Sequence, residues 1–265
     1  MMSLNRSWTI FLRQFFLLKR SPYRIFTLFY WPVMELFLWG VLTIYISKVG
    51  GERFSFITVL IGAIIFFNFF IRIQHGITIS FLEDVWVRNF INLFASPLTI
   101  AEYILGLLFT SVFQMTISIG FMIFLAWLLF AYNIFQFGLL LVPFVLILFI
   151  FGLALGILVT AIVLRLGPSS EILTWALPAI ISPLSGVFYP VNILPEFVQL
   201  IARIFPSTYV FDGMRNAVIS GTFNIQIFML ALAISFAWLA LSYWFLLRVY
   251  RVVLEKGLFT RFMTD

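Results

Sequence analysis

The segment from Phe137 to Leu164, FGLLLVPFVLILFIFGLALGILVTAIVL, contains no charged residue and decides the fold class. The hydrocarbon core of a bilayer is about 30 Å thick, and a helix needs about 20 apolar residues to cross it. Within lipid, every backbone polar group needs a hydrogen-bond partner from the protein, and a helix supplies that partner inside the same segment. We therefore predict that this segment is a transmembrane helix.

The composition of the whole chain is that of a membrane protein. Of the 265 residues, 63% are hydrophobic and 10% are charged, whereas soluble domains carry about 25% charged residues. Cysteine is absent, which excludes disulfides and thiolate metal sites, and the single histidine, His75, excludes a site with several histidines. The net charge of +6 lies at the ends of apolar segments, so it indicates a membrane surface as the partner and not nucleic acid.

Six apolar segments predict an all-α, polytopic membrane protein that forms one domain over residues 1–265. The segments are residues 25–46, 56–81, 103–130, 137–164, 172–189 and 225–247. The fifth segment is short and is interrupted by Pro178 and Pro183. The first segment starts too far from the N-terminus and is too long to be a cleaved signal peptide.

Basic residues predict the orientation of these six transmembrane helices. If the N-terminus is cytoplasmic, most of the 16 lysines and arginines lie on the cytoplasmic side. Four lie on the outer side, namely Lys48, Arg53, Arg203 and Arg215. Because cytoplasmic loops of membrane proteins are enriched in Lys and Arg, we expect both termini in the cytoplasm.

Residues 3–20 are predicted to form an amphipathic helix that lies in the membrane surface. Apolar side chains recur at helical spacing along one face of this helix. Arg6, Arg13 and Arg20 lie on another face, where they would meet anionic lipid head groups. The alternative is that these charges only set the orientation of the first transmembrane helix.

Residues 83–97, EDVWVRNFINLFASP, join the second and third transmembrane helices on the cytoplasmic side. Glu83 and Asp84 suit a helix N-terminus because of the helix dipole, and the last proline prevents continuation. Trp86 and Phe90 share one face of the resulting helix. We expect a short helix parallel to the membrane, which serves either as a connecting turn or as a docking element for another protein.

Residues 190–224 join the fifth and sixth transmembrane helices on the outer side. Two stretches within them are too apolar for a free loop and too short to span, so we expect two half-inserted helices. Irregular backbone of this kind is typical of a lined cavity. Four charged residues could either guide release of a substrate or anchor these helices at the head groups: Glu196, Arg203, Asp212 and Arg215.

Two charged residues lie inside the first two transmembrane helices. At a rise of about 1.5 Å per residue, Glu35 lies about 16 Å and Arg72 about 13 Å from the cytoplasmic ends of their helices. A charge at mid-bilayer costs about 2.5–3.5 kcal/mol and therefore usually has a partner. We predict an ion pair between Glu35 and Arg72, with His75 one turn nearer the cytoplasm. The pair would be either a structural staple or part of a proton path.

Motifs for nucleotide or catalytic chemistry are absent from the sequence. A phosphate-binding loop needs Gly-Lys followed by Ser or Thr, and Lys19, Lys48 and Lys256 do not occur in that pattern. Neither a nucleophile turn nor a cluster of carboxylates at one membrane depth is found. We expect this chain to have no enzymatic activity, no metal and no cofactor of its own.

The order of these parts resembles the ABC-2 type permease family, the membrane subunits of ABC exporters. The most specific stretch is SPLSGVFYPVNILP at residues 182–195. A Pro-x-x-Tyr sequence at residues 206–209 and a late arginine, Arg215, are also similar to the family pattern. Trp31 followed by proline resembles the polysaccharide branch. The resemblance covers essentially the whole chain.

The resemblance implies a separate ATP-binding subunit that holds ATP and Mg²⁺ and docks on residues 83–97. Many family members have Gly-Thr-x-Glu in this segment, which is replaced here. The candidate contacts are Glu83, Asp84, Trp86, Arg88, Asn89, Phe90 and Asn92.

The resemblance also implies two permease copies, expected to form a homodimer in a bacterial inner membrane. Their first and fifth transmembrane helices would line the pathway. Aromatic side chains make up 20% of the sequence. They suit an amphipathic or lipid-linked substrate, such as a glycolipid, polysaccharide, lipid or drug.

Three other classes of protein remain open at this point. A stand-alone secondary transporter would have to use Glu35, Arg72 and His75 as its titratable groups. A membrane-embedded enzyme would need clustered His, Asp or Glu side chains, which the sequence lacks. An assembly or scaffold protein is the third. Co-purification of an ATP-binding protein would favour the exporter, and proton-coupled uptake by the chain alone would favour the secondary transporter.

Overall fold

The computed structural model describes residues 3–50, 54–89, 92–93 and 95–256, and these residues form helices and no strands. The α-helices are α1 (Leu4–Arg20), α2 (Pro22–Gly50), α3 (Phe54–Trp86), α5 (Ile100–Phe130), α6 (Leu141–Leu166), α7 (Leu173–Leu184), α8 (Glu196–Ala202), α9 (Pro206–Ser220) and α10 (Ile225–Glu255). Three short 3-10 helices are η1 (Ile134–Leu140), η2 (Pro168–Ile172) and η3 (Val191–Ile193). The all-α prediction is confirmed.

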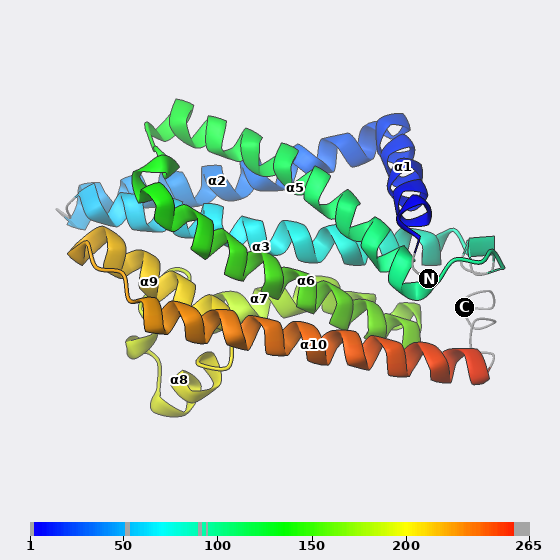
Figure 1. Ribbon diagram of the computed structural model, residues 1–265. Helices are drawn as coiled ribbons and strands as arrows, with labels where there is room; N and C mark the ends of the chain where they lie inside the picture. Colours follow the sequence, from blue (N-terminus) through cyan, green and yellow to red (C-terminus); the bar gives the residue numbers. More distant parts are fainter. Residues whose placement is uncertain (1–2, 51–53, 90–91, 94, 257–265) are drawn as a thin grey trace.

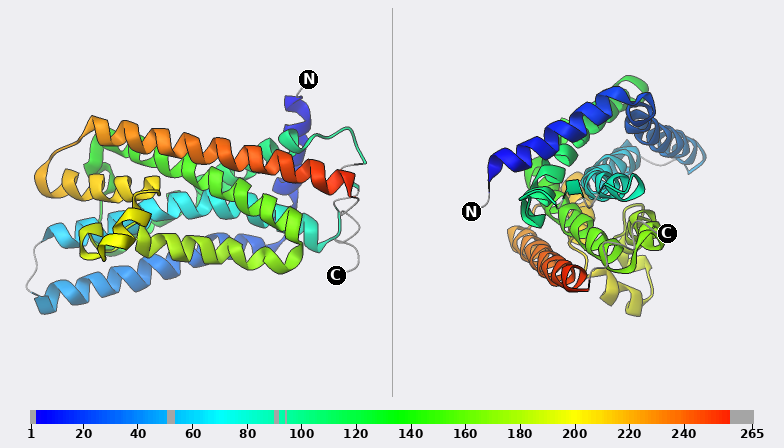
Figure 2. Two further views of the ribbon diagram at one scale, coloured as in Figure 1. Left: turned by 90° about the horizontal axis from the view of Figure 1, so that it is seen from below. Right: turned by 90° about the vertical axis from the view of Figure 1, so that its right-hand side faces the viewer.

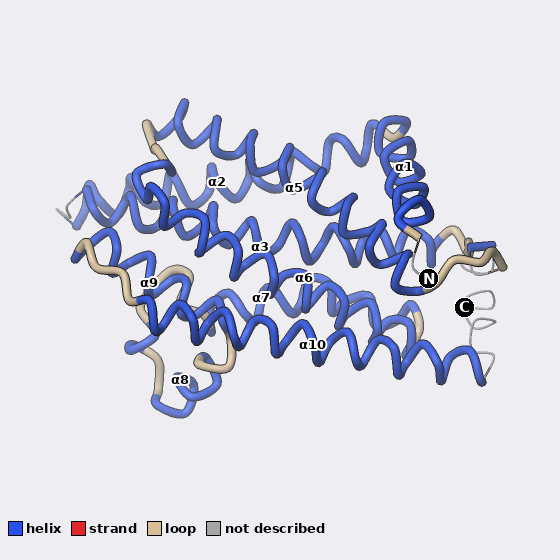
Figure 3. The backbone as a smooth tube through the Cα atoms, viewed as in Figure 1, coloured by secondary structure: helices blue, strands red, loops and turns tan. Residues whose placement is uncertain are grey.

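Five helices in the described part of the chain are long and apolar enough to cross a membrane. They are α2, α3, α5, α6 and α10, which run side by side in Figures 1 and 2. Loops lie mainly at the two ends of this bundle, apart from those around α8 (Figure 3). Five of the six predicted transmembrane segments therefore correspond to long helices.

The predicted fifth transmembrane segment, residues 172–189, is shorter in the structure. It corresponds to α7, whose 12 residues extend about 18 Å at the rise of an α-helix. Pro178 and Pro183 lie inside this helix, where each removes a backbone donor, and Gly186 has a positive φ of 64° just beyond its end. The helix α7 lies toward the end of the bundle that holds α1, whereas α9 lies toward the other end (Figures 1 and 2).

Helix α3 is the centre of the bundle. It packs against α2 and α5 on one side and against α6 on the other (Figure 1). Phe66, Phe70 and Phe81 of α3 are fully buried, because this helix is apolar around most of its circumference. On α6, Gly152 allows close approach, since a Cβ atom there would lie 2.7 Å from the carbonyl oxygen of Phe70.

Helix α1 confirms the predicted N-terminal amphipathic helix and lies across the long helices (Figure 1). Part of its apolar face packs against the protein. The ring of Trp8 lies 6.3 Å from that of Phe109, and the rings of Phe11 and Phe15 lie 5.9 and 5.4 Å from that of Phe113, both on α5. The position of α1 is therefore fixed by α5 as well as by its amphipathic character.

Two helices, α8 and α9, occur in the predicted external segment, residues 190–224. Helix α9 packs against α3, α6 and α10 and buries Val210, Phe211 and Met214. By contrast, α8 leaves its apolar residues Phe197 and Leu200 exposed. The expected pair of helices is thus present, and one of them belongs to the core of the bundle.

Candidate functional site

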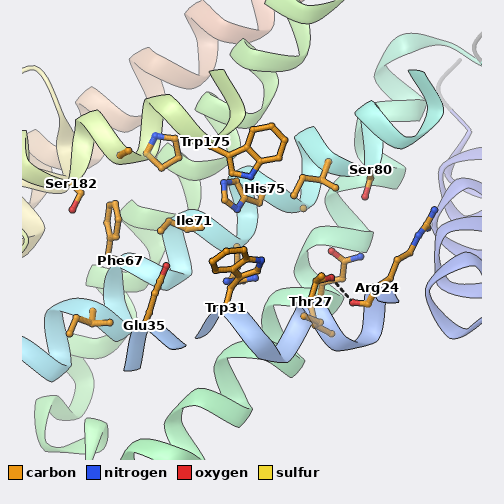
Figure 4. A pocket seen from close by; sticks show the side chains of 18 of the residues that line it. Arg24, Thr27, Trp31, Glu35, Phe67, Ile71, His75, Ser80, Trp175 and Ser182 are labelled. Atoms are coloured by element: carbon orange, nitrogen blue, oxygen red, sulfur yellow. Dashed lines mark hydrogen bonds between the residues drawn. The ribbon is translucent and has the colours of Figure 1, made fainter. Parts of the chain in front are cut away.

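A cavity of about 730 Å³ lies between α2, α3 and α7. Figure 4 shows Trp31 and Glu35 from α2, His75 from α3 and Trp175 from α7 around it. The cavity forms because α2 and α7 both pack on α3 but make little contact with each other. At the end away from α1 its wall includes Trp39 and Phe188, whose rings stack at 4.0 Å.

Both intramembrane charges predicted from the sequence line this cavity, but they do not form the predicted ion pair. Glu35 Oε2 instead accepts a hydrogen bond of 2.7 Å from Asn68 Nδ2. The Nε atom of Arg72 is buried and has no partner, and no carboxylate of the described residues pairs with its guanidinium. Asn68 lies one helical turn before Arg72, and a depth estimate from residue counting does not resolve one turn.

His75 links α3 to α7. Its Nε2 atom lies 3.2 Å from the carbonyl oxygen of Thr174, and Gln74 Nε2 donates to the same oxygen at 3.3 Å. The first residues of α7 are thereby held against the middle of α3. Within the described residues, no group of three or more His, Asp and Glu side chains could hold a metal ion.

Glu83 and Asp84 lie in the last turn of α3, which corrects the expectation that they begin a helix; the helix predicted over residues 83–97 includes residues outside the described part of the chain. Helix α3 continues to Trp86, because the hydrophobic pattern of the second transmembrane helix extends through Val85, which is buried. Carboxylates at a helix C-terminus are unfavourable in the field of the helix dipole. These two therefore need cations from elsewhere.

Two other helices supply these cations. Arg24 of α2 lies 3.0 Å from Glu83. Asp84, which is 0% exposed, pairs with Arg13 of α1 and accepts a hydrogen bond of 2.7 Å from the hydroxyl of Tyr103. Burial by itself lowers the pKa of Arg13, but the hydrogen bond and the charge of Asp84 outweigh burial and raise that pKa above its ordinary value.

A second carboxylate holds the start of α1. Glu102 accepts backbone hydrogen bonds from Ser3 at 2.7 Å and from Thr99 at 2.9 Å, and Arg6 lies 3.5 Å from it. Arg6 and Arg13 therefore pair with protein carboxylates, contacts that the sequence did not predict. Arg20 is exposed and forms no ion pair with the described residues.

Trp86 connects the end of α3 to η2. Its Nε1 atom donates a hydrogen bond of 2.7 Å to Glu171 Oε2, although half of its surface is exposed. Arg88 follows in an exposed turn with a positive φ of 56°, a conformation that is uncommon for a residue with a Cβ atom. Asn92 is also exposed and donates to Asn89 Oδ1 at 3.2 Å.

The seven predicted docking residues therefore differ in accessibility. Trp86, Arg88 and Asn92 are exposed, Asn89 is half-buried, and Glu83 is held by Arg24. Asp84 is buried and is not available to a partner, which corrects its assignment as a docking contact. Phe90 lies outside the described residues.

The four predicted external residues do not form one cluster. Asp212 and Arg215 form an ion pair of 2.9 Å within α9 and line a second cavity of about 500 Å³ between α6, α9 and α10. Glu196 and Arg203 are exposed at the two ends of α8. Only the first two charges thus share a site.

Sequence reasoning missed three polar residues that connect neighbouring helices, namely Glu102, Asn68 and Glu171. The role of Glu102 could have been predicted from the sequence, because Thr99-x-x-Glu102 matches a capping box, and both of its reciprocal hydrogen bonds are formed. The roles of Asn68 and Glu171 could not be predicted from the sequence, since their hydrogen-bond partners lie 33 and 85 residues away in the chain.

A family model described as ABC-2 type transporter matches residues 6–219. The chain belongs to the ABC-2 type transporter family. The match runs from α1 to α9 and so includes the walls of the larger cavity and the turn that follows α3. Comparison with curated proteins gives no significant match. This permease is a multi-pass membrane component of an ABC transporter, and its family partners with an ATP-binding cassette subunit.

Proposed function

We propose that this permease is the pathway-forming subunit of an ATP-driven exporter and docks its ATP-binding subunit on the exposed turn after α3. The observation that carries the proposal is the hydrogen bond between Trp86 and Glu171. It connects a side chain that is exposed at the end of α3 with η2, which continues into α7 at the wall of the larger cavity.

Two sets of contacts would transmit a force from this turn to the walls of the cavity. The first passes through Trp86 and Glu171 to α7, and the second passes through the ion pair of Glu83 with Arg24 to α2. Because α2 and α7 form opposite walls of the cavity, force applied to the end of α3 would change their separation. This is the property that energy coupling from a separate subunit requires.

The substrate that we propose is amphipathic or lipid-linked: a glycolipid, polysaccharide, lipid or drug. Four tryptophans line the larger cavity: Trp31, Trp39, Trp86 and Trp175. Two charged groups from the predicted transmembrane segments, Glu35 and Arg72, line it as well. Tryptophan combines a large apolar surface with one polar donor, and such walls suit a molecule with both an apolar and a polar part.

Further elements of the proposal concern the assembly. ATP and Mg²⁺ would bind to the partner subunit and not to this chain. Two permease copies, expected as a homodimer, would enclose one pathway with α2 and α7 facing it. The excess of basic residues near α1 supports cytoplasmic termini in a bacterial inner membrane.

Co-expression with the ATP-binding subunit of the same transporter tests the docking surface. We expect the double variant Trp86→Ala, Arg88→Ala to lose most of the ATP-binding subunit on affinity purification, because aromatic and arginine side chains dominate interface energetics. A matched control is Phe197→Ala, Arg203→Ala on α8, which removes an exposed aromatic and an exposed arginine at another surface. Undiminished co-purification with the Trp86 and Arg88 variant would overturn the proposed docking site.

A further inference from the structure

We propose that the larger cavity binds an oxyanion, such as a phosphate or carboxylate on an apolar tail, through the guanidinium of Arg72. That this ligand is the transported substrate rests on the proposed function; that the site binds an oxyanion rests on the cavity alone. Arg72 lies inside the transmembrane part of α3 and lines the cavity between α2 and α7.

Arg72 differs from the other arginine at the cavity in that it has no ion pair with a described residue. The other arginine that lines the cavity, Arg24, is neutralised by Glu83 at 3.0 Å. Arg72 has a buried Nε atom without a hydrogen-bond partner and no ion pair with any described carboxylate. An intramembrane charge is costly unless it has a partner or water, so a ligand that supplies an acceptor is favoured at this position.

Neither acid that lines the cavity forms an ion pair with Arg72, since Glu83 pairs with Arg24 and Glu35 bonds to Asn68. Glu35 comes from the α2 wall and accepts its hydrogen bond from Asn68 at 2.7 Å. The charge of Glu35 acts on Arg72, but no hydrogen bond or ion pair joins the two side chains within the described residues. The buried Nε donor of Arg72 consequently has no acceptor within the described residues.

The chemistry of the ligand follows from the guanidinium and its surroundings. Arginine presents a planar fork of donors that matches two oxygens of a phosphate or carboxylate. Trp31, Phe67, Ile71 and Trp175 provide apolar walls, and both tryptophans are partly exposed on the open side between α2 and α7. The volume of about 730 Å³ accommodates a head group and the start of a chain that continues into lipid.

Binding of a short-chain lipid to the purified full chain tests this assignment. The chain is placed in phosphatidylcholine nanodiscs and titrated with dihexanoyl phosphatidic acid, with dihexanoyl glycerol as the uncharged counterpart, and tryptophan fluorescence is followed. We expect Arg72→Gln to weaken binding of the phosphatidic acid about tenfold or more, as for the loss of a charge-assisted hydrogen bond. Binding of dihexanoyl glycerol should be unchanged.

Two further variants separate a binding role from a structural one. Glu35→Gln keeps an acceptor for Asn68 and removes the negative charge, so we expect it to strengthen binding of the phosphatidic acid. Arg165→Gln removes an exposed arginine at the end of α6, outside the cavity, and should leave binding unchanged. The assignment is overturned if Arg72→Gln weakens binding no more than Arg165→Gln, or if Glu35→Gln weakens it.

The source of the oxyanion is decided by changing the bilayer. In nanodiscs that contain phosphatidylglycerol, competition with the short-chain ligand in the wild type but not in Arg72→Gln would assign the site to bilayer lipid. If the affinity for the short-chain phosphatidic acid is undiminished in these nanodiscs, the site is assigned to the transported substrate and not to bilayer lipid. These measurements use the permease without its ATP-binding subunit, so their failure is distinguishable from failure of the docking surface on Trp86 and Arg88.

Discussion

The buried ion pair between Arg13 and Asp84 should hold α1 onto the bundle. Asp84 is 0% exposed and the side chain of Arg13 is 27% exposed. Replacing Asp84 by Asn keeps the shape but leaves the guanidinium without its counter-charge in a mostly buried place. Removing one partner of a buried pair costs about 3–5 kcal/mol, and partial exposure of Arg13 reduces this to about 2–3 kcal/mol.

Hydrogen exchange of the α1 amides in nanodiscs measures this effect. A loss of about 2–3 kcal/mol in local opening free energy corresponds to exchange that is about 30- to 150-fold faster. The amides of α10 serve as an internal reference because α10 makes little contact with α1. The matched control is Asp212→Asn, which removes the acid of the ion pair in α9.

A second substitution sharpens the test. In the double variant Arg13→Gln, Asp84→Asn, the unpaired charge is removed as well, so exchange of α1 should return part of the way to the wild-type rate. The reasoning is refuted if Asp84→Asn accelerates exchange of α1 no more than Asp212→Asn does. It is also refuted if α1 in the double variant exchanges faster than the product of the separate effects of Arg13→Gln and Asp84→Asn on its exchange rate predicts.

Two further predictions concern packing and coupling. Gly152→Ala should lower the thermal stability, because the added Cβ atom would lie 2.7 Å from a carbonyl oxygen of α3. The control Gly120→Ala should leave the stability unchanged, because its Cβ atom meets nothing within 4 Å. Thermal unfolding of the two variants checks this. Trp86→Phe removes the donor to Glu171 but keeps an aromatic ring. We expect the ATP-binding subunit still to co-purify and substrate-stimulated ATP hydrolysis to fall about tenfold, an effect that Trp127→Phe at an exposed position of α5 should lack.

Most of the architecture could be predicted from local sequence. Long apolar segments, the amphipathic N-terminal helix and the two short helices between residues 190 and 224 all appear at their predicted places, with ends that differ by at most eight residues. Local sequence mispredicts the end of α3, because Glu83 and Asp84 carry the signature of a helix start when only neighbouring residues are considered. Their cations, Arg13 and Arg24, come from helices far away in the chain.

The sequence by itself determined that this protein crosses a membrane, since the transfer of apolar side chains into lipid depends on each segment alone. Which helices border the cavity, and which acid meets which base, depended on the rotation and axial position of each helix against its neighbours. Those variables are set by side-chain packing between distant segments. Only the tertiary structure therefore placed Glu35 beside Asn68, left the Nε atom of Arg72 without a hydrogen-bond partner and buried Asp84.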